Sequence, residues 1–151
     1  MKNPIIRKYG LLMAAGFIFY FLFMKLIGLH DVVELRVLNF FIIIGGVGLS
    51  IHQSLKRNPD TFGYFEGLRV GVITSAIGVT TFAIFIFFYL AFIDIEFMLW
   101  IKENVPLGSF LDPFSIMVTI EVEGMASGFL ATFIIMQYEK GHVNTPENHK
   151  L

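Results

Sequence analysis

Apolar stretches of about twenty residues recur along this chain, and they decide what it can fold into. A helix of that length crosses the hydrocarbon core of a bilayer, because each residue adds about 1.5 Å. The stretches lack the alternation typical of barrel strands, so helices are the structure that satisfies their backbone groups in lipid. We expect transmembrane helices over residues 9–29, 36–54, 67–93 and 114–138.

The composition agrees with an all-α polytopic membrane protein that has little mass outside the bilayer. Hydrophobic residues make up 56% of the chain and charged residues 15%, against roughly 25% charged residues in soluble domains. The apolar run after the basic start continues to Met24 without a small-x-small cleavage site, which predicts an uncleaved first span. We expect one antiparallel four-helix domain over residues 1–140 and a polar tail over 141–151.

The distribution of Lys and Arg between the loops predicts the orientation of the bundle. Eight of these residues fall on the side of the two termini: Lys2, Arg7, Lys8, Lys56, Arg57, Arg69, Lys140 and Lys150. The other three are Lys25, Arg36 and Lys102, on the side where the loops are acidic. Because loops rich in Lys and Arg are retained on the cytoplasmic side of the membrane, both termini are predicted to be cytoplasmic.

Turn motifs predict where the third and fourth spans begin. In "KRNPDTF", Asp60 or Thr61 is the expected N-cap of the third span. In "LDPFS", Asp112 is the expected N-cap of the fourth span and Pro113 its first helical residue. Residues 94–113, between these two spans, are expected to form a short loop.

Small residues recur at helical spacing on the third and fourth spans. Close approach at such positions, together with polar contacts, holds helices together in lipid, where the hydrophobic drive between helices is absent. The pattern predicts packing of the two spans within one chain, and a dimer interface or a substrate groove is the alternative. The expected packing residues are Gly67, Gly71, Ser75 and Gly78 on the third span, and Gly124, Ser127 and Gly128 on the fourth.

Glu121 and Glu123 lie near the start of the fourth span, beside its smallest residues. A carboxylate inside a span is costly where it faces lipid, so it should face protein or water. The two residues point about 200° apart around a helix, so both cannot face the same partner. Three interpretations stay open: a wet outer interface, an interhelical bond that fixes the bundle, or a proton- or cation-handling role.

Lys25 is the candidate partner of these acids, because it lies near the outer end of the first span. A lysine that extends its charged end to the interface is the alternative. Asn39, in the outer part of the second span, could join the same layer by interhelical hydrogen bonding. We therefore predict an intramembrane polar cluster of Lys25, Asn39, Glu121 and Glu123.

The remaining polar residues predict no cofactor or metal. The chain has no cysteine, which excludes thiolate sites, and it shows no phosphate-binding loop or dinucleotide fingerprint. His30, Asp31 and Glu34 could place hard ligands on one turn, but without a fourth partner we interpret them as an outer loop. The net charge of −1 gives no basic field for nucleic acid, so membrane lipids are the expected surroundings.

Together these motifs resemble a known family. "RKYGLL" opens the first span, "TFGYFEGLRVG" opens the third and "FIDIEFM" follows it, and "EGMASGF" and "IIMQYEK" lie in the fourth. This outline is similar to the domain of unknown function 4199 family, small four-helix bacterial membrane proteins. The resemblance implies a bacterial inner-membrane location without an established activity, and its acid–glycine pattern favours Glu123, with Gly128, as the inward acid. Members often carry a longer charged insertion where this chain has residues 94–113.

The sequence favours a non-enzymatic structural or assembly component that forms a homo-oligomer or joins a larger membrane complex. The alternative is a small ion-coupled carrier that acts as an oligomer through Glu123. A lipid-directed enzyme is disfavoured, because no acid, base and nucleophile come together in the pattern.

Overall fold

The structure, a computed structural model, describes residues 4–28, 37–139 and 141. These residues form helices and no strand. In chain order the elements are α1 (Pro4–Leu26), α2 (Val37–Arg57), α3 (Tyr64–Phe88), the π-helical turn η2 (Tyr89–Ile93), α4 (Ile95–Asn104), the 3-10 turn η3 (Gly108–Phe110) and α5 (Pro113–Glu139). By length and composition α1, α2, α3 extended by η2, and α5 could each cross a membrane. The predicted all-helical architecture with four long apolar helices is confirmed.

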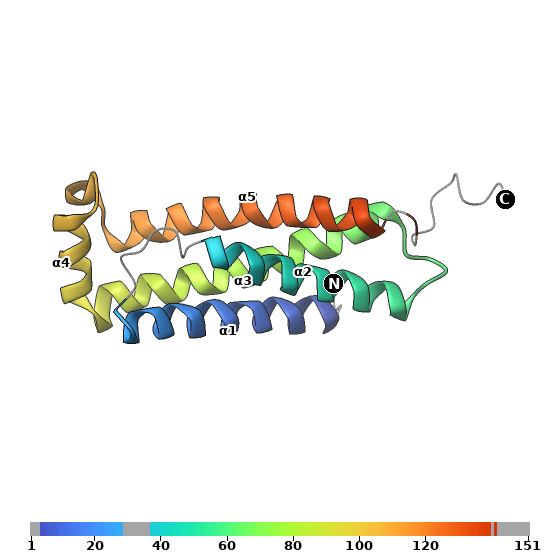
Figure 1. Cartoon of the computed structure of the whole chain (residues 1–151), viewed down its shortest axis with the longest axis horizontal. Helices are drawn as coiled ribbons and strands as arrows, with labels where there is room; N and C mark the ends of the chain where they lie inside the picture. The colour runs from blue at the N-terminus through green and yellow to red at the C-terminus, as the bar shows by residue number, and fades with distance from the viewer. Residues whose placement is uncertain (1–3, 29–36, 140, 142–151) are drawn as a thin grey trace.

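The four long helices run side by side along the longest axis of the molecule, and α4 lies across one end (Figure 1). The start of α1 and the end of α5 both point toward the opposite end (Figure 1). His30, Asp31, Glu34 and Arg36 lie outside the described residues, as do 142–151 of the predicted tail.

The segment between α3 and α5 is not the short loop that the sequence predicted, because it contains α4. The side chain of Asp94 caps this helix by accepting a hydrogen bond of 2.9 Å from the backbone N–H of Phe97. Met98 is buried, and Phe97 and Ile101 pack against the bundle core. A helix of this length is held by packing rather than by its own propensity, which is why the sequence pattern did not predict it.

Helix α3 is the centre of the bundle, and it packs closely on α5 through small residues. A Cβ added at Gly67 would overlap Met136, and one added at Gly71 would overlap Thr132. From the other side, a Cβ at Gly128 would overlap Ser75. The structure therefore places most of the predicted packing residues between α3 and α5 of one chain.

The other small residues have different neighbours. Gly78 faces α1, where a Cβ would overlap Met13. Gly124 faces Val79 on α3, and Ser127 is half-buried. The small residues of α3 thus serve two contacts rather than one, because α3 lies between α1 and α5.

The two predicted helix starts have different outcomes. Helix α5 begins at Pro113, and the backbone N–H of Ser115 donates a hydrogen bond of 2.6 Å to the Asp112 carboxylate, as predicted. The N-cap of α3 is Gly63, with no side-chain cap, so the prediction of Asp60 or Thr61 is wrong.

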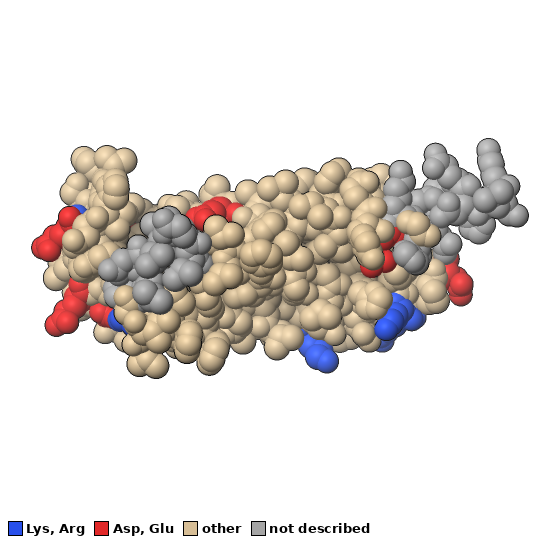
Figure 2. Space-filling model, in the orientation of Figure 1, with Lys and Arg blue, Asp and Glu red and all other residues tan. Residues whose placement is uncertain are grey.

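Most charged side chains gather at the two ends of the bundle, and the band between them is largely apolar apart from acidic atoms on one side (Figure 2). At the end away from α4, the described Lys and Arg residues are Arg7, Lys8, Lys56, Arg57 and Arg69. At the α4 end, acidic residues prevail: Asp94, Glu96, Glu103 and Asp112. The band between them is the surface that a bilayer would cover.

Substitution Gly71→Ala should destabilise the bundle, because its Cβ would overlap the Thr132 side chain. Overpacking of this kind costs about 1–3 kcal/mol and exceeds the roughly 1 kcal/mol of helix propensity that Ala adds. Gly45→Ala is the matched control, since nothing lies within 4 Å of a Cβ there. The free energy of unfolding in mixed detergent micelles checks this. Equal stability of the two variants would contradict the close α3–α5 contact.

The Asp112 cap should give a measurable pH dependence. Hydrogen bonds from the Ser115 hydroxyl and backbone N–H lower the pKa of Asp112 below its ordinary value of 3.8. A lowered pKa means that the ionised cap stabilises the fold above that value and loses its contribution as the pH falls through the folded-state pKa. The stability difference between wild type and Asp112→Asn should therefore be constant above about pH 5 and shrink below about pH 4 in unfolding titrations. A difference that does not change with pH would exclude this role.

Candidate functional site

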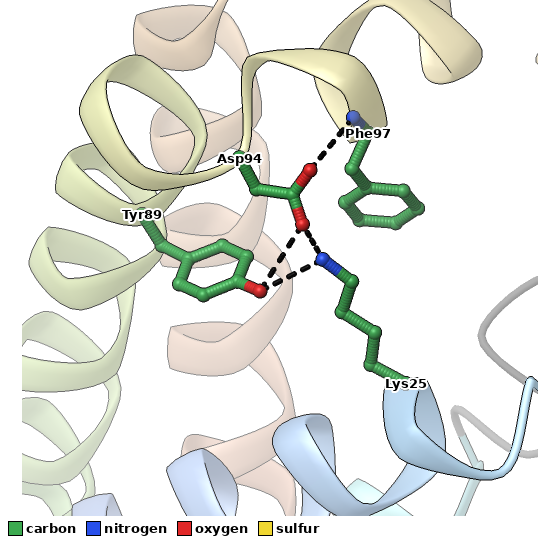
Figure 3. Close-up of polar contacts among 4 residues, drawn as sticks. All are labelled: Lys25, Tyr89, Asp94 and Phe97. Carbon is green, nitrogen blue, oxygen red and sulfur yellow. Dashed lines mark hydrogen bonds and ion pairs between the residues drawn. The ribbon is translucent and has the colours of Figure 1, made fainter.

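Lys25, Tyr89 and Asp94 form a polar cluster at the corner where α3 turns into α4 (Figure 3). The Lys25 ammonium donates a hydrogen bond of 2.8 Å to the Tyr89 hydroxyl and forms an ion pair with the Asp94 carboxylate. The Tyr89 hydroxyl donates to the same carboxylate at 3.2 Å. Each of these three groups, called here the corner cluster, contacts the other two.

The π-helical turn brings the members of the corner cluster together. In η2 the backbone N–H of Asp94 donates to the carbonyl of Tyr89 at 2.9 Å, five residues back, so Asp94 lies over Tyr89. The carboxylate then has one oxygen for the α4 N-terminus, through Phe97 N–H, and one for Lys25. Such turns inside helices are frequent at functional sites. Here the turn fixes how α1, α3 and α4 meet at this end of the bundle.

Aromatic rings surround the Lys25 charge. Its Nζ lies 5.0 Å from the Tyr89 ring centroid and 5.3 Å from that of Phe97, within cation–π range. The side chains of Lys25 and Asp94 are 27% and 16% exposed. A pair this sheltered from solvent is worth more than a surface ion pair, and removal of one partner leaves the other poorly solvated.

A second polar contact lies deep in the apolar band. The Thr80 hydroxyl on α3 donates a hydrogen bond of 2.7 Å to the Glu121 carboxylate on α5. Glu121 is half-buried and Thr80 is exposed, so these two residues, the deep pair, lie at the edge of the α3–α5 contact. The carboxylate is reachable from the outer surface of the bundle.

The level of the deep pair follows from its neighbours on α3. Gly78 lies against Met13, and the Phe82 and Phe17 ring centroids are 5.2 Å apart, so Thr80 lies level with residues 13–17 of α1. Thr80 precedes Tyr89 by nine residues, which is about 14 Å along the helix axis. The distance between the deep pair and the corner cluster along the helix is thus about half the thickness of the hydrocarbon core of a bilayer.

This spacing shows that the structure does not assemble the predicted cluster of Lys25, Asn39, Glu121 and Glu123. Lys25 pairs with Asp94, at a different level from Glu121. Glu123, which the family pattern favoured as the inward acid, is exposed, and Glu121 instead contacts α3. The Asn39 side-chain oxygen is buried without a hydrogen-bond partner among the described residues.

Hydroxyl groups fill part of the bundle interior. Ser50 of α2 and Thr74 of α3 are hydrogen-bonded at 2.8 Å, and both are fully buried. Thr74 and Thr132 also donate to the carbonyls of Val70 and Gly128 four residues before them. These bonds satisfy the hydroxyls of Ser50, Thr74 and Thr132 and hold the fold, whereas the buried Ser54 hydroxyl has no hydrogen-bond partner among the described residues.

Sequence reasoning missed Tyr89, Asp94 and Thr80. The signal for Asp94 was available, because an acid before the mixed segment "IEFMLWI" is a typical N-cap. No such signal marks Tyr89 or Thr80 in the sequence, since both lie inside an apolar run and their partners come from other helices. Among the described residues no group of His, Asp and Glu could hold a metal ion.

Comparison with known proteins identifies the family. The family model described as "Protein of unknown function (DUF4199)" matches residues 8–105, about two thirds of the chain. The match includes Lys25, Thr80, Tyr89 and Asp94, and it ends before α5. The chain belongs to this family, as the resemblance indicated. No curated protein and no solved structure matches it in these comparisons.

Substitution Lys25→Met should destabilise the fold by about 1.5–3 kcal/mol, because the partly buried Asp94 loses its charged partner. Lys102→Met, an exposed lysine on α4, should change stability by less than about 0.5 kcal/mol. A double-mutant cycle with Asp94→Asn, read as the free energy of unfolding, should give a coupling of about 1 kcal/mol or more. Additive effects of Lys25→Met and Asp94→Asn would contradict a direct interaction.

Proposed function

We propose that this member of the DUF4199 family is a non-enzymatic, multi-pass protein of the bacterial inner membrane that acts as a structural or assembly component. The four long apolar helices cross the bilayer, and both termini lie in the cytoplasm. The protein packs with further transmembrane helices, in a homo-oligomer or a larger membrane complex, and α4 lies along the outer face.

The charge distribution supports this orientation. The end where α1 starts and α5 finishes carries the described Lys and Arg residues other than Lys25 and Lys102. Basic residues are retained on the cytoplasmic side during insertion, whereas acidic residues contribute little to topology. The acidic α4 end then faces outward, and Lys25 joins the corner cluster at the outer interface.

The deep pair is the observation that carries the assembly role. In this placement Glu121 lies near the middle of the bilayer, where a charged side chain costs about 2.5–3.5 kcal/mol or more. Its one hydrogen bond from Thr80 leaves acceptor capacity on a carboxylate that is open to the outer surface. A second transmembrane helix that donates hydrogen bonds to Glu121 removes it from lipid and gains a specific contact.

The filled axis of the bundle supports assembly over transport by a single chain. Val47, Ile51, Val70, Ala131 and Met136 are fully buried at its centre. An ion-coupled carrier remains the alternative because Glu121 lies at a depth where such carriers place a carboxylate. That carrier would act at the perimeter of the bundle, between copies, with Glu121 rather than Glu123 as its acid.

Crosslinking in native membranes tests the assembly role. The chain has no cysteine, so Val122→Cys, exposed beside Glu121 on α5, gives a unique reporter. We expect a thiol crosslinker to join this position to a neighbouring copy or membrane protein. Adding Glu121→Leu should reduce the crosslinked fraction about tenfold, because each lost interhelical hydrogen bond is worth about 1–2 kcal/mol.

Two control variants test whether the crosslink at Val122→Cys depends on the deep pair. Phe19→Cys lies on α1, away from the deep pair, at a position about as exposed as Val122, and its crosslinked fraction should not change when Glu121→Leu is added. Glu103→Leu, at the exposed end of α4, should leave the Val122→Cys product unchanged. Crosslinking that is unchanged by Glu121→Leu, together with proton-dependent solute flux in liposomes that is lost in Glu121→Gln, would replace the assembly role with the carrier.

A further inference from the structure

A hollow of about 290 Å³ lies at the basic end of the bundle, between the start of α1 and the end of α2. The described residues that line it are Pro4, Ile5, Lys8, Tyr9 and Gln53. It lies at the opposite end of α1 from the corner cluster, and neither polar site described above contributes to it. We propose that this hollow, called here the basic hollow, binds the phosphate headgroup of an anionic phospholipid of the inner leaflet.

The level of the basic hollow suits a headgroup. The apolar run of α1 begins just after Lys8, and that of α2 ends at Ile51, shortly before Gln53. The basic hollow therefore lies where the apolar band meets the charged end of the bundle. This inference rests on the proposed bilayer placement, in which this level is the cytoplasmic headgroup region.

The lining has the chemistry of a phosphodiester site. Lys8 supplies a cation and Gln53 an amide donor, and both are exposed. Pro4 and Ile5 provide an apolar wall for the glycerol carbons and the upper acyl chains. None of the described residues that line the basic hollow is acidic, so none of them repels an anion.

The surroundings of the basic hollow add positive charge. Lys56 and Arg57 follow Gln53 by three and four residues on α2, and Arg7 follows Pro4 by three on α1, so all three lie on the same helix faces as the lining. A polybasic surface of this kind attracts anionic lipids. A single lysine would hold any anion weakly, but a cluster around a shaped hollow selects a lipid phosphate.

The size of the basic hollow limits the ligand. Sites for small molecules span roughly 300–1,000 Å³, so this one is at the lower limit. It takes a headgroup with its phosphate rather than a whole lipid, and the acyl chains then lie along the exposed apolar surface of α1, which includes Leu11, Leu12 and Phe19.

Native mass spectrometry of the full chain in detergent tests the proposal with phosphatidylglycerol and phosphatidylcholine as probes. We expect phosphatidylglycerol adducts at concentrations where phosphatidylcholine gives few. Lys8→Gln should weaken phosphatidylglycerol binding about fivefold, the effect of one cation near an anionic lipid. Lys8→Arg should restore binding, and Lys102→Gln, at the far end, should not change it. Because Lys8 is exposed, these variants should fold as the wild type does.

Three results would overturn the proposal: equal adducts with the two lipids, equal loss in Lys8→Gln and Lys102→Gln, or displacement of phosphatidylglycerol by millimolar inorganic phosphate. The last would identify a site for a free anion instead of a lipid headgroup. Glu121→Leu should retain full phosphatidylglycerol binding, so failure of the assembly role and failure of this lipid site give different results.

Discussion

The close contact of α3 with its neighbours is the constraint on which the rest of the structure depends. The backbones of α3 and α5 approach closely at Gly67, Gly71 and Gly128, because a glycine has no Cβ to keep the facing helix away. In an apolar solvent such contacts replace the hydrophobic drive that packs soluble helices. Because the glycines receive side chains of the facing helix, they also fix the register of the helices. The α3–α5 register places Thr80 beside Glu121, and the contact of Gly78 with Met13 of α1 accompanies the packing of Phe17 on Phe82.

The corner cluster closes one end of this arrangement. Helix α3 continues into η2, whose wider turn shifts the direction of the backbone and brings Asp94 back toward Tyr89. Asp94 then has two tasks, since it caps α4 and neutralises Lys25 on α1. One carboxylate therefore sets the angle of α4 across the bundle end and ties α1 to α3. The glycine contacts fix the middle of the bundle, and this ion pair fixes its end.

The sequence alone predicted the parts of this fold that depend on local pattern. Length and hydropathy predicted the four helices, and the Asp112–Pro113 pair predicted the start of α5. The predictions that failed depend on the rotation of a helix about its own axis and on contacts between residues far apart in the sequence. Glu121 and Glu123 differ by about 200° around α5, and no local pattern decides which of them faces α3. Lys25 was assigned to the wrong acids because its true partner, Asp94, looked like part of a loop, and a short helix stabilised by packing leaves little trace in its own residues.

Charged groups outside the corner cluster lie at the perimeter of the bundle, and two side-chain oxygens inside it, on Asn39 and Ser54, are buried without a hydrogen-bond partner among the described residues. At its centre, hydroxyls such as Ser50 and Thr74 are bonded to each other or to backbone carbonyls, and apolar side chains fill the rest. The deep pair and the basic hollow, in contrast, lie at the surface, one in the apolar band and one at its charged boundary. In the proposed bilayer placement, a filled bundle with polar groups on its outer surface is suited to act through neighbouring molecules rather than through a passage of its own. The corner cluster does not share this property, because its charges are satisfied within the chain, and so its role is to hold the shape that presents the other two sites.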